Sequence, residues 1–300
     1  MDFRLTDDQR ALVRAIRDLL GRRFGPDALR AAADADGAGE LDRGLWRELG
    51  AAGFFALRLP EDAGGVGLGL PEAALLFEEA GRALLPGPLV ATHLAAGRVP
   101  GAAEGTAVVT RADGGLVEWL DAADVVLGVG DGGVPRPIRS VDPLTPLHRL
   151  AYAQLDTGDV PDAHEASLLT AAEQLGSAGR TTALAVAHAR VREQFGRPIG
   201  SFQAVKQLCA HMLVRTEVAR AAVYAAAVTA DPVEIAGARL LADEAAAECA
   251  RDCLQVHGGM GFTWEAEVHL HLKRAWVRAA RGLGGAVAEE AVAKSLAATP

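Results

Sequence analysis

The sequence predicts a mainly α-helical protein with a small β module in its middle and a four-helix bundle at its C-terminal end. Half of the 300 residues are hydrophobic but only 5% are aromatic, and alanine is abundant, which favours closely packed helices over sheet. Apolar residues recur at helical spacing towards both ends of the chain. In the middle, glycine, proline and short apolar runs replace that spacing, so strands are expected there.

Residues 1–95 are expected to form an N-terminal helical domain. Thr6 and Gln9 have the spacing of a capping box, in which a hydroxyl and an amide close the start of a helix. Pro71 suits the first turn of a later helix, because its missing N–H has no partner there in any case. That helix is expected to stop at residues 86–88, Pro-Gly-Pro, which cannot continue it.

Residues 96–163 are expected to form the small β module. Short apolar runs are separated there by turn residues, which is the pattern of strands in a compact sheet. The three runs are TAVVT (106–110), DVVLGVG (124–130) and LAYAQLD (150–156).

Residues 164–300 return to helical spacing and are expected to form the bundle. A long amphipathic helix reaches Phe195, and the segment 196–200, GRPIG, interrupts it. Ser201 is expected to cap the next helix, since a serine hydroxyl can accept from the first free amides. Asp231-Pro232 marks a further break between helices.

Composition excludes several classes of protein. The formal net charge of −9 argues against general nucleic-acid binding, which needs clustered Lys and Arg. No apolar run approaches the roughly 20 residues of a membrane span, and the acidic N-terminus is no signal peptide. Cys209, Cys249 and Cys253 form no disulfide framework, which fits a reducing, cytoplasmic setting. None has partners at zinc-like spacing, so no metal site is expected.

The segment RDCLQVHGGMGFTWE, residues 251–265, places three glycines within four positions directly after a helix. A dinucleotide-binding fold needs a strand before such a run, so that interpretation is rejected. A tight turn at a helix C-terminus needs one glycine at positive φ, and three exceed that need. Close approach of a ligand or of another chain remains as a further explanation.

A second unusual segment, RVREQFGRPIGSFQ, spans residues 190–203. It groups Arg192, Arg197 and Gln203 around a break between two helices. A solvated loop is one interpretation. An anion clamp is the other, because arginine offers phosphate a planar fork and the start of a helix adds positive dipole.

Together these segments resemble the FAD-dependent acyl-CoA dehydrogenase family along nearly the whole chain. The stretches MDFRLTDDQRALV, LPEDAGGVGLGLPE, REQFGRPIGSFQAVK and QVHGGMGFTWE occur in the family's order. The resemblance implies a helical N-terminal domain, a β middle domain and a C-terminal four-helix bundle. It also implies FAD as cofactor, an acyl-CoA substrate, an electron-transfer flavoprotein as acceptor, and a tetramer.

In that family each FAD lies across a dimer interface, and the neighbouring subunit holds its adenosine and pyrophosphate end. Carried over to this chain, the residues in that role are Arg192, Gln194, Phe195, Gln203, Gln255, Gly258 and Gly259. The residue types suit the task, because arginine and bare backbone amides bind phosphate and an aromatic ring packs against the cofactor.

Two departures from the family's pattern concern catalysis. The family's general base is usually a glutamate in a loop after the last shared helix, and Gly282 stands at that position here. An alternative family position falls near Ala166. Glu165, one residue away, is a weak replacement because one residue turns a side chain about 100° around a helix. The family's flavin-bed loop is also not visible between Leu89 and His164.

Base and flavin bed belong to one active site in the family, so their joint absence suggests an incomplete subunit. The chain is expected to form an α2β2 acyl-CoA dehydrogenase with a partner that carries the catalytic glutamate. It is similar to small paired members of actinobacterial steroid side-chain degradation, which implies a steroid-CoA substrate. Two alternatives remain open: a homomeric enzyme with Glu165, Glu265 or Glu267 as base, and a non-enzymatic scaffold subunit.

Overall fold

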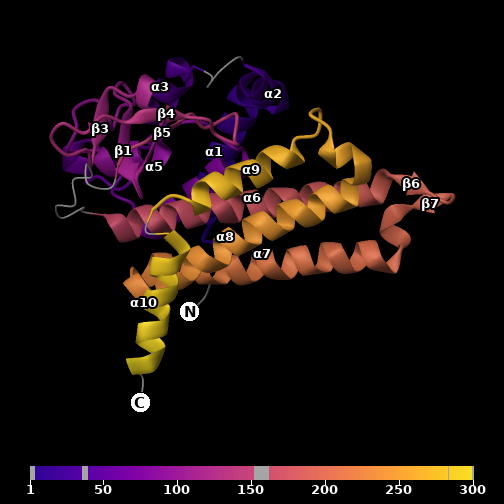
Figure 1. The fold of residues 1–300 in the computed structure, drawn as a ribbon. Helices are drawn as coiled ribbons and strands as arrows, with labels where there is room; N and C mark the ends of the chain where they lie inside the picture. Colours follow the sequence, from indigo (N-terminus) through magenta and orange to yellow (C-terminus); the bar gives the residue numbers. More distant parts are fainter. Residues whose placement is uncertain (1–3, 36–39, 152–161, 283, 299–300) are drawn as a thin grey trace.

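The computed structural model describes residues 4–35, 40–151, 162–282 and 284–298. Helices form both ends of the chain and a small sheet lies between them in sequence, which confirms the mainly α-helical class (Figure 1). The helices of the N-terminal part are α1 (Asp7–Arg23), α2 (Pro26–Asp34), α3 (Arg43–Ala51), α4 (Leu70–Arg82) and α5 (Leu89–Ala95).

A capping box marks the start of α1 and a proline in the first turn marks the start of α4. The Thr6 hydroxyl accepts from the Gln9 backbone N–H at 3.2 Å, and the Thr6 N–H donates to Gln9 Oε1 at 3.0 Å, so the predicted capping box is confirmed. Pro71 lies in the first turn of α4, as predicted. Helix α5 has no such signal, because its N-cap residue Pro88 makes no side-chain hydrogen bond.

The middle of the chain forms a five-stranded sheet in the order β3–β1–β2–β5–β4. Strands β1 and β3 are parallel, and the other neighbouring pairs are antiparallel. The strands are β1 (Val109–Asp113), β2 (Leu116–Glu118), β3 (Val125–Leu127), β4 (Arg136–Ile138) and β5 (Leu147–Arg149).

Two of the predicted strands overlap β1 and β3, and the third needs correction. The run at 150–156 is wrong at its start, since Leu150 and Ala151 follow β5 without strand structure. Its remainder, from residue 152, lies outside the described residues. The apolar run includes Leu150, which is buried beyond the end of β5 and packs with Val117. The Leu150 N–H also donates to the Gly115 carbonyl at 2.8 Å, so one further hydrogen bond follows β5 without extending the strand.

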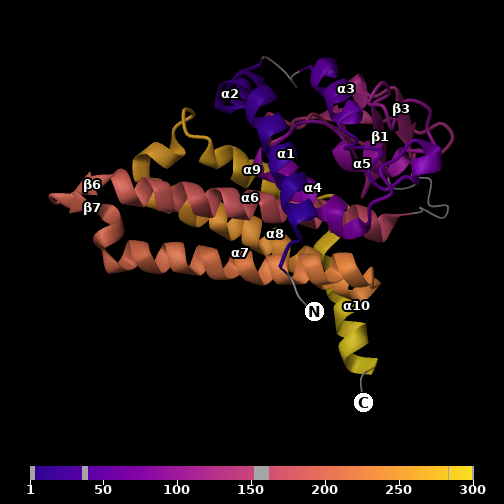
Figure 2. The ribbon, with the colours of Figure 1, turned by 180° about the vertical axis from the view of Figure 1, so that it is seen from behind.

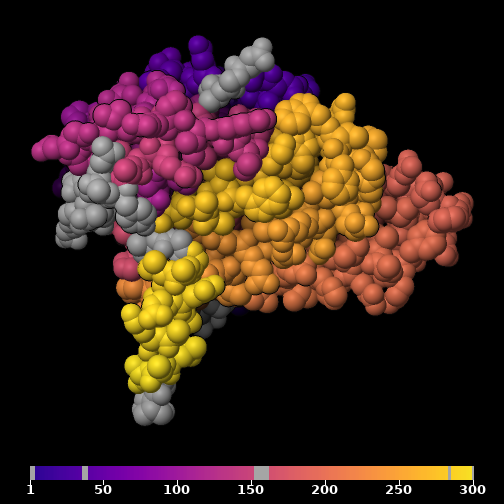
Figure 3. Space-filling model, viewed as in Figure 1, coloured from indigo at the N-terminus to yellow at the C-terminus, as the bar shows by residue number. Residues whose placement is uncertain are grey.

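Four helices of the C-terminal part lie alongside one another as the bundle (Figures 1 and 2). Helix α8 packs against the other three, and its small buried side chains Ala245, Cys249 and Cys253 allow close approach. The four helices are α6 (Ala163–Val191), α7 (Gln203–Thr229), α8 (Pro232–His257) and α9 (Val268–Ala279). A further helix, α10 (Gly284–Ala298), leaves the bundle beside α8 and projects from the body of the molecule (Figure 3).

One predicted cap in the bundle is wrong and one break is confirmed. Ser201 lies in a short 3-10 helix, Ile199–Ser201, and α7 starts after Phe202, which makes no side-chain cap hydrogen bond. Asp231 caps α8, since its Oδ1 accepts from the N–H groups of Val233 and Glu234 at 2.9 and 3.0 Å. In the described part of the chain, no helix has the length and apolarity that crossing a membrane requires.

The N-terminal helices are fixed to the bundle where α4 crosses α6. A Cβ on Gly176 would lie 1.8 Å from the Glu78 carbonyl oxygen, and one on Gly81 would lie 2.0 Å from the Glu173 carbonyl oxygen. Because neither position has room for a side chain, the two helices meet through bare backbone. One continuous core therefore joins residues of both parts, such as Phe77 and Leu175.

Candidate functional site

Two segments that are far apart in sequence meet at one end of the bundle. Helix α6 ends there in a short hairpin, β6 (Glu193–Gln194) and β7 (Arg197–Pro198), and α8 ends there in the glycine turn (Figure 1). The imidazole rings of His188 and His257 stack between them, with centroids 4.2 Å apart. The structure thus brings together the segments predicted to hold a cofactor. We call their seven predicted contact residues the clamp: Arg192, Gln194, Phe195, Gln203, Gln255, Gly258 and Gly259.

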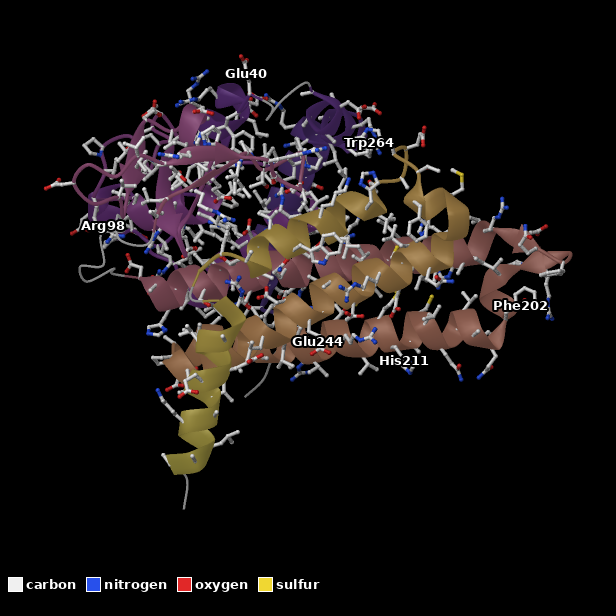
Figure 4. The ribbon with its side chains drawn as sticks, viewed as in Figure 1. Glu40, Arg98, Phe202, His211, Glu244 and Trp264 are labelled. Atoms are coloured by element: carbon white, nitrogen blue, oxygen red, sulfur yellow. The ribbon has the colours of Figure 1, made fainter. Side chains whose placement is uncertain are left out.

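The hairpin turn holds Phe195 in an unusual backbone conformation. Phe195 and Gly196 have φ values of 54° and 73°, as the two central residues of a tight hairpin turn require. Positive φ is uncommon for a non-glycine residue and costs energy. The ring is nevertheless 91% exposed. The ring of Phe202, which Figure 4 labels at the start of α7, lies edge-on to it with centroids 6.0 Å apart. A solvent-exposed aromatic ring that a strained backbone holds in place is suited to packing against a bound group.

The polar clamp side chains are exposed and have few intramolecular partners. Within the described residues, the Arg192 guanidinium has no hydrogen-bond or ion-pair partner. Gln194 donates to the neighbouring Glu193 carbonyl at 2.9 Å, and Gln203 is exposed in the first turn of α7. Gln255 is exposed in the last turn of α8. A guanidinium without an ion-pair partner can bind a phosphate group.

The three glycines after α8 have different roles. Gly258 has φ 62° and ψ −141°, a combination essentially restricted to glycine, and a Cβ on Gly258 or Gly259 would meet nothing within 4 Å. Their outer side is open to an approaching group. A Cβ on Gly261 would instead lie 2.8 Å from the Leu254 carbonyl oxygen, so Gly261 serves internal packing. Only the first two glycines therefore fit the ligand interpretation.

Gly282, which the family resemblance places at the position of the catalytic glutamate, offers no carboxylate. Gly282 follows α9 with φ 80°, and a Cβ there would lie 3.6 Å from Arg239 Nη1 and 3.8 Å from the Asp113 carboxylate. The weak candidate Glu165 binds both guanidinium nitrogens of Arg58, with Oε1 at 2.9 Å from Nη2. Its carboxylate is thus held in a structural ion pair.

The other two candidate bases lie at the opposite end of α9 from Gly282. Glu267 precedes α9 and pairs with Arg180 at 2.7 Å. Glu265 lies on the exposed loop beside Trp264, which Figure 4 labels, and hydrogen bonds to its own backbone and to Thr263 lower its pKa. A carboxylate in a structural pair or in bulk solvent is poorly suited to taking a carbon-bound proton.

Sequence reasoning missed a ladder of three buried ion pairs along α9. Arg274, Arg278 and Arg281 recur at i, i+4 and i+7, which places them on one helix face. That spacing is the one signal of the ladder in the sequence. The pairs are Arg274 with Asp142, Arg278 with Glu173 at 2.9 Å, and Arg281 with Glu118 at 2.7 Å.

The ladder fills the space between the sheet and the bundle. Its acids come from three different places: the loop before β5, helix α6 and strand β2. Burial raises the pKa of Glu118, although Arg281 opposes this. The cavity lined by Glu118, Glu173, Arg278 and Arg281 has a volume of about 10 Å³, which is near the minimum for one water molecule. This region has no room for an organic substrate.

No group of three or more His, Cys, Asp and Glu side chains with the geometry of a metal site occurs among the described residues. Cys249 and Cys253 are buried in the bundle, and burial raises the pKa of both thiols. Neither is suited to nucleophilic chemistry, since the thiolate is the reactive form.

Comparison with known proteins adds a family context to this geometry. The family model of the acyl-CoA dehydrogenase N-terminal domain matches residues 6–108, and that of the C-terminal domain matches residues 164–296. Acyl-CoA dehydrogenase IpdE2 of Mycobacterium tuberculosis is 37% identical over 294 residues, covering 90% of this chain and 91% of that protein. Acyl-CoA dehydrogenase FadE34 of the same organism is 34% identical, covering 94% of this chain but 46% of that protein.

Among solved structures, the ChsE4–ChsE5 complex from Mycobacterium tuberculosis contains a similar chain. It superposes with a TM-score of 0.85 and 25% sequence identity, and the match covers 100% of both chains.

Proposed function

The chain belongs to the acyl-CoA dehydrogenase family, and from this premise we propose that it is one subunit of a heteromeric, FAD-dependent enzyme. In this proposal the clamp residues hold the adenosine and pyrophosphate end of FAD, and a partner subunit supplies the catalytic glutamate. One observation carries the proposal. Exposed clamp residues stand at one end of the bundle, while the family's base position at the other end is a glycine beside a filled space.

The clamp residues fit the cofactor end assigned to them. Arg192 is an unpaired, exposed guanidinium that can donate two parallel hydrogen bonds to the pyrophosphate. Phe195 presents its exposed ring for stacking, and the open backbone at Gly258 and Gly259 admits a phosphate or a ribose at close range. Gln194, Gln203 and Gln255 add amide donors and acceptors around the same end of the bundle.

The reaction itself takes place on the partner's side in this proposal. FAD held by the clamp would supply a hydride acceptor for the acyl-CoA β-carbon, and the α-proton would need a carboxylate base. In this chain Gly282 cannot take a proton, and Glu165 is bound by Arg58. The residues of this chain therefore bind and orient, and the proton transfer falls to a carboxylate of the partner subunit.

The match to relatives supports a pairing of two different chains. The similar solved chain is part of a ChsE4–ChsE5 complex, and FadE34 is about twice as long as the segment this chain matches. We infer an α2β2 assembly, an acyl-CoA thioester with a steroid side chain as substrate, and an electron-transfer flavoprotein as acceptor. The steroid assignment rests on the resemblance to the paired enzymes of steroid side-chain degradation.

Single substitutions of the candidate bases test this division of labour. Glu165→Gln, Glu265→Gln and Glu267→Gln in the purified complex are expected to leave acyl-CoA turnover within about twofold of wild type, because loss of a true general base costs about 10²–10⁴-fold. The assay uses straight-chain and steroid side-chain acyl-CoA thioesters with an artificial electron acceptor. Urea unfolding of Glu165→Gln serves as control, since this change weakens the Arg58 pair.

The alternatives predict different results in the same assay. A loss of about a hundredfold or more in one of these three variants would show that this chain supplies the base, as the alternative of a homomeric enzyme requires. A purified complex that contains no flavin would instead favour the non-enzymatic scaffold.

A further inference from the structure

A cavity of about 160 Å³ lies between the N-terminal helices and the bundle. Residues of α1, α2, α4, α6 and α9 line it, and Figure 2 shows this region where α1 and α4 lie over the bundle. None of the lining residues belongs to the clamp, to the ion-pair ladder or to the candidate bases. The cavity is therefore a separate feature, with no part in the proposed function.

Three guanidinium groups line the cavity, and one of them has no partner. Arg17 Nε donates to Glu79 Oε2 at 2.8 Å, and Arg180 pairs with Glu267 at 2.7 Å. Arg82 makes no hydrogen bond or ion pair with any described residue, although it is half-buried. Burial lowers the pKa of Arg82, the Glu79 charge opposes this shift, and the charges of Arg17 and Arg180 add to it.

The one histidine among the lining residues, His271, adds no positive charge. His271 is fully buried, burial holds its pKa well below the ordinary value, and its Nδ1 lies 2.7 Å from the Ser177 hydroxyl. Arg17 and Arg180 thus have carboxylate partners in Glu79 and Glu267, and the neighbouring Glu78 is paired with Arg220. One positive charge, on Arg82, is left for a ligand.

The rest of the wall is apolar or bare. Leu20, Phe24 and Leu29 supply apolar surface, and a Cβ on Gly21 would meet nothing within 4 Å. Helix α2 also starts at this wall, where its N-cap Gly25 has no side-chain hydrogen bond. The partial positive charge of a helix start favours an anion beside it.

We propose that this cavity binds a small carboxylate whose apolar body has about four to seven carbon atoms. The carboxylate pairs with Arg82 through two parallel hydrogen bonds, and the apolar body packs against Leu20, Phe24 and Leu29. The size follows from the volume, since a cavity of about 150 Å³ accommodates benzene. The charge follows from the one unpaired guanidinium, which a carboxylate would neutralise.

Isothermal titration calorimetry tests the site. Hexanoate is titrated into the purified complex of this chain with its partner subunit. Hexanoate is expected to bind saturably, and 1-hexanol, which lacks the charge, is expected to bind at least about tenfold more weakly. Arg82→Met should weaken hexanoate binding by at least about tenfold, whereas Arg22→Met, an exposed arginine on α1, should not change it. Because Arg82 forms no hydrogen bond or ion pair with the residues that the structure describes, the Arg82→Met variant should unfold at no lower urea concentration than wild type.

A second variant tests the apolar part of the site without touching the charge. Gly21→Leu places a side chain in the open space and should abolish hexanoate binding. Hexanoyl-CoA, whose thioester lacks a carboxylate, should not displace hexanoate. The proposal is wrong if wild type shows no saturable binding, if either Arg82→Met or Gly21→Leu binds hexanoate as wild type does, or if hexanoyl-CoA competes.

Discussion

Replacing Glu173 with leucine is expected to lower the free energy of unfolding by about 3–5 kcal/mol. Glu173 and Arg278 are 5% and 2% exposed and form the central pair of the ladder on α9. Burial already lowers the pKa of Arg278 to about 10, with the Glu173 charge opposing that shift. Without Glu173, the guanidinium is left as an uncompensated buried charge, which is the costly outcome for a buried pair. Urea unfolding followed by circular dichroism measures the loss.

Two further variants separate the pair from a general effect of leucine. Glu173→Leu combined with Arg278→Met should recover most of the loss, because replacing both partners of a buried pair by apolar side chains is often neutral. Glu290→Leu on α10 removes a carboxylate from the exposed pair with Lys294 and should cost less than about 1 kcal/mol. Wild-type stability in the single Glu173→Leu variant would show that the Glu173–Arg278 pair contributes nothing to the free energy of unfolding.

Arg192→Met in the purified complex is expected to weaken FAD binding by at least about tenfold. The reason is the loss of charge-assisted hydrogen bonds to a phosphate, each of which contributes about 1.5–3 kcal/mol. The substitution removes no side-chain hydrogen bond or ion pair, since Arg192 forms none with the described residues. The fold should therefore be unaffected. Flavin absorbance after dialysis against decreasing FAD concentrations measures the affinity.

The matched control is Arg190→Met, which removes the same charge from an exposed position two residues earlier on α6. It should retain FAD as wild type does, because two residues along a helix turn a side chain about 200° around its axis, away from that of Arg192. Equal FAD retention by the Arg192 and Arg190 variants would remove Arg192 from the clamp.

Features set by neighbouring residues could be predicted from the sequence. The capping box of Thr6 and Gln9, the proline start of α4 and the cap at Asp231 each depend on groups within three residues of one another. The predicted Ser201 cap also depended on neighbouring residues but is wrong, because the backbone makes one more short turn before α7 begins. A single sequence contains no signal for that extra turn.

Features that join distant parts of the chain could not be predicted in this way. Arg274 and Asp142 are 132 positions apart, and no periodicity links them. The packing role of Gly261 depends on the Leu254 carbonyl folding back over it. The clamp residues could be grouped only through the family resemblance, because their segments meet where α6 and α8 end together, at the stacked His188 and His257 rings.

The division of one FAD site between two subunits is best tested by the FAD-to-protein ratio of the complex. The complex is purified after co-expression of this chain with the partner subunit. In the proposed α2β2 assembly, this chain holds only the adenosine and pyrophosphate end of FAD, and the partner carries the base. Each FAD site therefore needs both subunits, and we expect one FAD for every two chains. Mass measurement of the intact complex and flavin absorbance together give this ratio. A homotetramer of this chain alone, with one FAD per chain and acyl-CoA turnover, would contradict the account.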